Sequence, residues 1–241
     1  MIADFLPLSV TNIQDPEAIA LFKQLQRRVI QVRFNQGTVL VSTAFIHQPD
    51  SSSQFPQTPI LLLHGFDSSV LEFRRLLPLL TVERETWALD LFGFGFTEHS
   101  SQVAVNPQTI RQHLYSFLST CICQSVILVG ASLGGAVAID FALHHPDSVK
   151  ALVLIDSVGF SGSFPLGQFL PSPVIEWGAD WLHLRKLAAL TAALFLPINQ
   201  PTLIDAVRCS LLHHEMPGWK AAIASFTESG GYRNPKLVVR I

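Results

Sequence analysis

Charged side chains are scarce in this chain: they make up 14% of its 241 residues, against 49% hydrophobic residues. Acidic and basic side chains nearly balance, giving a formal net charge of −2, and no run of basic residues occurs. A protein that binds phosphates along a nucleic acid needs a basic face, so the composition excludes that partner. Length and apolar content instead predict one large globular domain, or a core with a smaller insertion.

Cysteine and long apolar runs are also in short supply. Cys121, Cys123 and Cys209 match neither a disulfide framework nor a metal-ligand spacing, so we expect packed thiols. The most apolar late stretch, residues 187–196, is shorter than the roughly 20 residues that cross a bilayer. The first residues show no signal-peptide pattern. We therefore expect a cytoplasmic protein without a transmembrane segment, for which peripheral contact with lipid stays open.

Short apolar stretches alternate with helical patterns through the middle of the chain. The apolar stretches lack polar alternation, as in strands buried on both faces, and lie at residues 59–63, 86–91, 126–129 and 151–155. Helical patterns lie between them, at residues 69–80, 107–119 and 133–144. This alternation predicts an α/β fold with a mostly parallel, doubly wound sheet and helices on both faces.

The first third of the chain has a different pattern. Asp15 and Pro16 predict the start of a helix that we expect to reach about Val29. Two strands around a turn at Gln36 and Gly37 follow it.

Ligands of parallel sheets bind at the carboxyl ends of the strands. Four stretches should meet at that edge, namely residues 64–66, residues 90–95, Ser132 and Asp156.

Ser132 stands between an expected strand and an expected helix, in the run Gly130-Ala131-Ser132-Leu133-Gly134. This G-x-S-x-G pattern is typical of a sharp strand-to-helix turn that lifts a serine hydroxyl above the sheet. Any side chain at the two glycines would crowd that turn. The helix start directs free N–H groups to the same spot, so we expect the Leu133 N–H to donate to an oxyanion.

A second oxyanion donor is expected from the loop after the first buried strand, residues 64–66. Gly65 allows the backbone to pass close to a ligand, and the N–H of Phe66 can face the oxyanion. His64 could serve as a base there, but we expect it to shape the loop by hydrogen bonding.

Three cofactor motifs fail on single residues. A phosphate loop needs Lys and Ser or Thr after its last glycine, where Ala136 and Val137 stand. A dinucleotide fingerprint starting at Gly93 needs glycine where Glu98 stands, and a zinc helix starting at His214 needs His where Gly218 stands. No metal or organic cofactor is implied.

The chain resembles the α/β-hydrolase superfamily, in particular its capped esterase- and lipase-like serine hydrolases. The resemblance rests on residues 63–66, "LDLFGFGFTE" at 89–98, "LVGASLGG" at 128–135 and "LVLIDSVGF" at 152–160. It is nearest to a branch from chloroplasts and cyanobacteria. It implies Ser132 as nucleophile, with Phe66 and Leu133 as the oxyanion donors.

The resemblance also implies a division of the chain. Residues 1–157 would form the hydrolase core, residues 158–225 a helical cap, and residues 226–241 the return to the core. The family places its catalytic acid and its histidine later, in the order Ser, acid, His. We therefore expect the chain to lack the last strand–helix units and to be a fragment. Asp156 as acid, and His213 or His214 as base, are the weaker internal alternatives.

These features predict a serine hydrolase that cleaves the carboxylic ester of an apolar substrate through an acyl-enzyme on Ser132. Apolar and aromatic residues of the expected cap suit an acyl chain or a terpenoid-like alcohol, or else form the cap's own core: Phe160, Phe164, Phe169, Trp177, Trp181, Leu190 and Phe195. A C–C hydrolase, a cofactor-free peroxidase and an acyltransferase stay open. The alternative of another class is a non-catalytic ligand-binding homologue.

Overall fold

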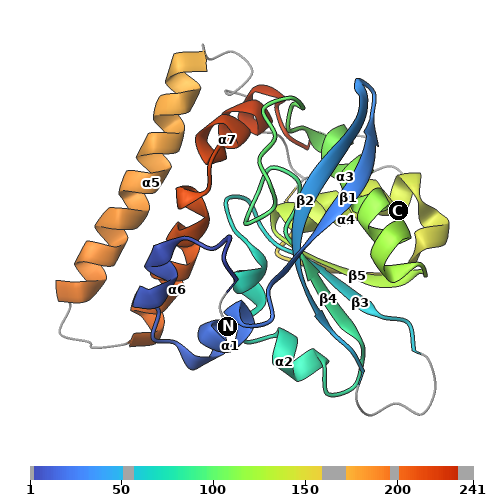
Figure 1. Ribbon diagram of the computed structural model, residues 1–241, viewed down its shortest axis with the longest axis horizontal. Helices are drawn as coiled ribbons and strands as arrows, with labels where there is room; N and C mark the ends of the chain where they lie inside the picture. Colours follow the sequence, from blue (N-terminus) through green and yellow to red (C-terminus); the bar gives the residue numbers. More distant parts are fainter. Residues whose placement is uncertain (1–2, 51–56, 159–171, 196–200, 233–241) are drawn as a thin grey trace.

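A six-stranded sheet crosses the molecule and separates helices on its two faces (Figure 1). The computed structural model describes residues 3–50, 57–158, 172–195 and 201–232. The order across the sheet is β1-β2-β4-β3-β5-β6. The strands are β1 (Gln26–Phe34), β2 (Gly37–Gln48), β3 (Ile60–Leu63), β4 (Thr86–Leu89), β5 (Val126–Ala131) and β6 (Val149–Ile155).

The four strands β3 to β6 are parallel to one another, and β1 and β2 form an antiparallel hairpin beside β4. Leu63 pairs with Leu89 on one side and with Gly130 on the other. The carboxyl ends of β3, β4 and β5 therefore lie side by side. This confirms the prediction of a mostly parallel α/β sheet.

Helices follow the strands as the sequence pattern indicates. The α-helices are α1 (Pro16–Phe22), α2 (Leu77–Leu80), α3 (Pro107–Phe117), α4 (Leu133–His144), α5 (Ser172–Phe195), α6 (Pro201–Leu212) and α7 (Trp219–Glu228). Shorter helical turns are η1 (Leu8–Asn12), η2 (Val70–Phe73), η3 (Leu118–Ile122), η4 (Pro146–Ser148) and η6 (His213–Glu215). The predicted cap at Asp15 is confirmed, because its carboxylate accepts the N–H of Glu17 at 3.1 Å.

Alternate residues of the central strand supply two separate cores. Leu61 and Leu63 of β3 face the core that includes α3 and α4. Ile60 and Leu62 face the opposite core, which includes α1 and η2. Both faces of β3 are thus covered, which explains why its sequence is apolar throughout.

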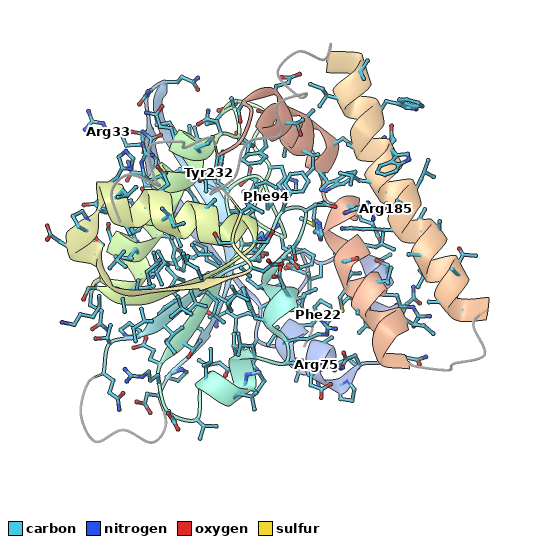
Figure 2. All side chains as sticks on the ribbon, turned by 180° about the vertical axis from the view of Figure 1, so that it is seen from behind. Phe22, Arg33, Arg75, Phe94, Arg185 and Tyr232 are labelled. Atoms are coloured by element: carbon cyan, nitrogen blue, oxygen red, sulfur yellow. The ribbon has the colours of Figure 1, made fainter. Side chains whose placement is uncertain are left out.

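Three helices, α5, α6 and α7, lie together beside the sheet and are called the outer helices below. α5 packs against α6 and α7 and is the outermost of the three (Figure 1). Phe94 lies on the side of the core that faces them (Figure 2), and its ring centroid is 5.5 Å from that of Phe226 on α7. Among the residues described, no helix combines the length and apolar character that a membrane crossing requires.

The first helix is shorter than expected, because α1 ends at Phe22 and residues 26–29 belong to strand β1. Every second residue of β1 from Ile30 to Phe34 is buried, a spacing of two that suits a strand. Pairing with β2 along its whole length then satisfies the backbone of β1.

The prediction of one helix at residues 69–80 is also wrong, since the structure has two short helices there, η2 and α2. η2 is tied to the end of β4, because the Val70 N–H donates to Asp90 Oδ1 at 2.7 Å. Pro78 lies in the first turn of α2, where proline starts a helix without losing a hydrogen bond.

Candidate active site

Four loops leave the carboxyl ends of the parallel strands, and they include all the stretches predicted to meet there. Residues 64–66 follow β3, residues 90–95 follow β4, Ser132 follows β5 and Asp156 follows β6. Parallel pairing of these strands puts the four loops on one edge of the sheet.

Ser132 has a strained backbone, with φ 50° and ψ −114°, between β5 and α4. A Cβ on Gly130 would lie 2.3 Å from the carbonyl oxygen of Gly134. A Cβ on Gly134 would lie 2.1 Å from the carbonyl oxygen of Leu63. The turn therefore closes only with glycine at both places, as the sequence pattern predicts.

The Ser132 side chain is half-buried. The hydroxyl has no hydrogen-bond partner among the described residues, and the Leu133 N–H at the start of α4 has none there either. The loop of residues 64–66 lies beside it, since a Cβ on Gly65 would be 3.4 Å from the Ser132 Cβ. Ser132, Leu133 and this loop are thus brought together.

His64 is fully buried and both of its ring nitrogens bond to backbone. Nε2 accepts the N–H of Leu91 at 3.1 Å, so the proton is on Nδ1, which donates to the Gly65 carbonyl at 2.8 Å. The Gly65 N–H in turn donates to Glu72 Oε2 at 2.9 Å. His64 therefore shapes the loop, as expected, and has no free nitrogen to act as a base.

Asp90 joins the loops after β3 and β4. Its buried carboxylate accepts the N–H groups of Val70 at 2.7 Å and Phe96 at 2.8 Å. Burial raises the pKa of Asp90 to about 6, although these two hydrogen bonds and the charge of Arg27 oppose the shift. The Asp90 side chain is used in holding the edge of the sheet together.

The internal alternatives for acid and base do not reach Ser132. Asp156 is exposed, with φ 45°, and makes no side-chain hydrogen bond to any described residue. His213 and His214 are buried in η6 and bond to Asp67. All nine histidines lie within the described residues, and none is bonded to the Ser132 hydroxyl.

Asp67 has a buried carboxylate that nothing in the local sequence singles out. Side chains from α5, η6 and α7 surround it: Lys186 on α5, His213 and His214 on η6, and Trp219 on α7. These five residues are called the Asp67 cluster below. The histidine pair was the one visible signal, and its partner lies 146 residues earlier.

Three side chains of the Asp67 cluster have the types and spacing of a metal site. One ligand atom from each of Asp67, His213 and His214 lies within 4.8 Å of the others. Lys186 Nζ, however, is 2.7 Å from Asp67 Oδ2 and 3.1 Å from His214 Nε2. An ammonium group already neutralises the carboxylate, so these residues fit an ion-pair cluster rather than a metal.

An apolar cavity of about 410 Å³ lies between α5 and α7, next to the loop after β3. Its apolar lining comes from Phe66, Val174, Ile175, Ala179, Trp181, Leu182, Ile223 and Phe226. Trp181 contributes as expected, but Trp177 does not, because it is 74% exposed on α5. The side chains of Phe160, Phe164, Phe169 and Phe195 lie outside the described residues, as do residues 233–241 of the return expected at 226–241.

The comparisons with known proteins agree with this geometry. The family model for the alpha/beta hydrolase fold matches residues 58–195. The alpha/beta hydrolase domain-containing protein VTE7 of Arabidopsis thaliana is 36% identical over 236 residues, which cover 95% of this chain and 69% of that protein. A plant relative is in line with the predicted branch.

Two further relatives cover less sequence or show the fold alone. The 2-hydroxymuconate semialdehyde hydrolase of Pseudomonas sp. strain CF600 is 30% identical over 146 residues, 59% of this chain and 50% of that protein. A thermophilic esterase from Thermogutta terrifontis superposes with a TM-score of 0.63 at 19% identity, over 85% of this chain and 71% of that one.

The chain thus spans between half and about two thirds of the length of these curated relatives. The strained strand-to-helix turn at Ser132, the sheet order and the matched family model nevertheless agree with one another. This chain belongs to the alpha/beta hydrolase family.

Proposed function

We propose that the protein is a serine hydrolase that cleaves a carboxylic ester of an apolar substrate. One observation carries the proposal: the Ser132 hydroxyl stands unpartnered among the described residues, on a strained turn at the N-terminus of α4. Ser132 Oγ forms a bond to the substrate carbonyl carbon, and the carbonyl oxygen becomes an oxyanion. The N–H groups of Leu133 and Phe66 donate hydrogen bonds to this oxyanion. The alcohol leaves with a proton, and water then releases the acid.

The cavity between α5 and α7 supports an apolar substrate. Phe66 lines it directly after Gly65, so an acyl chain in the cavity would place its ester beside the Ser132 turn. In this proposal the cap over the site is residues 158–225, which include α5, α6 and most of α7.

Turnover needs a general base as well, because a serine hydroxyl alone is a weak nucleophile. No imidazole among the described residues is bonded to Ser132, so we expect slow hydrolysis by this chain on its own. The same observation favours the second candidate, a ligand-binding homologue that uses the cavity without chemistry.

A fluorophosphonate probe with an alkyl chain separates the two functions. We expect an adduct that raises the intact mass, maps to Ser132 by peptide analysis, and is absent from Ser132→Ala. Ser119→Ala is the matched control, because the Ser119 hydroxyl bonds to the Tyr115 carbonyl on the exposed side of the chain. Saturable binding of a fatty-acid ester to a chain that never forms the adduct would favour the ligand-binding protein instead.

A further inference from the structure

Asp67, whose carboxylate is buried, follows Phe66 directly in the chain. The partners of this carboxylate come from α5, η6 and α7. We propose that Asp67 is a positioning residue. Its contacts with Lys186, His213, His214 and Trp219 fix the loop in which the Phe66 N–H donates a hydrogen bond to the oxyanion. This inference rests on the proposed function.

The distances show how closely the Asp67 cluster is packed. Oδ1 is 3.1 Å from His213 Nε2 and 3.0 Å from Trp219 Nε1, and Oδ2 is 2.7 Å from Lys186 Nζ. His214 Nε2 is 3.0 Å from Oδ1 and 3.1 Å from Oδ2. The His214 ring stacks on Trp219 with centroids 3.9 Å apart. Each carboxylate oxygen is therefore held from more than one element.

The backbone of Asp67 is part of the same arrangement. Lys186 Nζ donates to the Asp67 carbonyl at 3.0 Å and to the Ser210 carbonyl at 3.0 Å, besides its contact with the carboxylate. Asp67 has φ 49°, a left-handed conformation that few side chains tolerate. Ammonium and carboxylate together thus tie the residue after Phe66 to α5 and to Ser210 of α6.

The contacts of the cluster assign one of its histidine protons. His213 Nδ1 is buried and has no partner among the described residues, so its proton is on Nε2, which donates to Asp67. His214 Nδ1 lies 2.9 Å from His183 Nδ1, and its Nε2 faces both Asp67 and the Lys186 ammonium, the latter at 3.1 Å. The contacts therefore assign the proton of His213 and not that of His214. Two N–H groups, of His213 and Trp219, and the Lys186 ammonium therefore donate to one carboxylate, with the His214 ring beside it.

The charge states fit this assignment. Burial alone would raise the pKa of Asp67, but hydrogen bonds from His213 and His214 and the charge of Lys186 hold it well below its usual range. Burial lowers the pKa of His213 to about 3, despite its bond to Asp67, so this ring is neutral near pH 7. Burial lowers the pKa of Lys186, and the charge and hydrogen bond of Asp67 oppose that shift.

Asp67→Asn tests the role with little change of shape, because asparagine tolerates positive φ and keeps the side-chain size. Asp205→Asn is the matched control. Asp205, on α6, also has a buried carboxylate. This carboxylate accepts the Gln14 N–H at 2.5 Å and pairs with Arg208 at 3.0 Å, away from the loop after β3. A loss of stability alone should affect both variants.

The measurement is the rate of fluorophosphonate adduct formation on Ser132, resolved into the binding constant of the probe and the maximal rate. We expect Asp67→Asn to lower the maximal rate about 10- to 100-fold with little change in binding, since a misplaced oxyanion donor affects the transition state. Asp205→Asn should label at the native rate. Hydrogen exchange of the amides at 64–69 should rise in Asp67→Asn alone.

Native-rate labelling of a folded Asp67→Asn chain would overturn the positioning role while leaving the proposed function intact. If Asp67→Asn does not fold, Trp219→Phe removes one donor to Oδ1 and keeps an aromatic ring against His214, and a native rate there would overturn the role equally. No adduct on the native chain would instead overturn the proposed function and, with it, this role of Asp67.

Discussion

The carbonyl oxygen of Leu63, at the end of β3, lies 2.1 Å from the point where a Cβ on Gly134 would stand. The first turn of α4 thus rests directly on the neighbouring strand. This contact brings the loop of residues 64–66 beside Ser132, because that loop starts where Leu63 ends.

Gly134→Ala should therefore destabilise the fold. The added methyl meets backbone rather than a flexible side chain, so α4 must shift, at a cost of about 3 kcal/mol, which exceeds the helix propensity gained. Urea unfolding of the variant and the native chain measures the difference. An unchanged midpoint would mean that α4 does not rest on β3 as described.

Gly178 on α5 gives the opposite expectation. A Cβ there has nothing within 4 Å, and alanine has a higher helix propensity than glycine, so Gly178→Ala should stabilise the chain by up to about 1 kcal/mol.

Gly178 also lines the apolar cavity, so Gly178→Phe should weaken binding of long-chain esters more than short-chain ones. Binding of both chain lengths to the native, Ala and Phe forms checks this, and equal loss for both would argue against the cavity as the acyl site.

Strain at Ser132 predicts an order of stability between two variants that lack the hydroxyl. Residues with φ 50° and ψ −114° favour glycine, so Ser132→Gly should be more stable than Ser132→Ala by about 1 kcal/mol. This estimate allows for the greater freedom of glycine in the unfolded chain. Denaturant unfolding of the two variants side by side measures the order, and an alanine form of equal or higher stability would contradict the strain.

Buried His113 predicts a loss of stability in mild acid. Burial lowers its pKa to about 3 in the folded chain, against 6.5 for an ordinary histidine. Unfolding therefore takes up a proton between these pH values, and stability falls as the pH falls, by about 2 kcal/mol at pH 5.

His113→Gln should remove this contribution of about 2 kcal/mol between about pH 7.5 and about pH 5, and leave that of buried His213, whose pKa is also about 3. Glutamine stays neutral and retains a donor for Thr43 Oγ1, which His113 Nε2 contacts at 2.8 Å. The exposed His144, replaced in the same way, serves as the control. Equal pH profiles for native chain and His113→Gln would place the acid sensitivity elsewhere.

The elbow at Ser132 was predictable because its causes are local. Two glycines, a serine, an apolar strand and a helix lie within one short run, and the same residues set the backbone and present the hydroxyl. The end of α1 was harder to predict. Residues between Phe22 and Val29 suit either helix or strand, and pairing with β2, a contact outside the local sequence, decides for the strand.

The Asp67 cluster was beyond local reasoning altogether. A lone aspartate in a loop and two histidines before Pro217 carry no spacing that links them. Their contact depends on where the outer helices settle against the sheet, which a single sequence does not reveal. Lys186, on a helix with an apolar sequence, gave no sign of its inward position.

Asp67 and Trp219 are 152 residues apart in the chain, and that separation has a consequence for folding order. Strands β3, β4 and β5 emerge from the ribosome long before α7 does, so the sheet can form while Asp67 still lacks its donors. Contacts across such long loops form slowly. The loop beside Ser132 therefore takes its final shape last, and a partly synthesised chain has a sheet without a finished site.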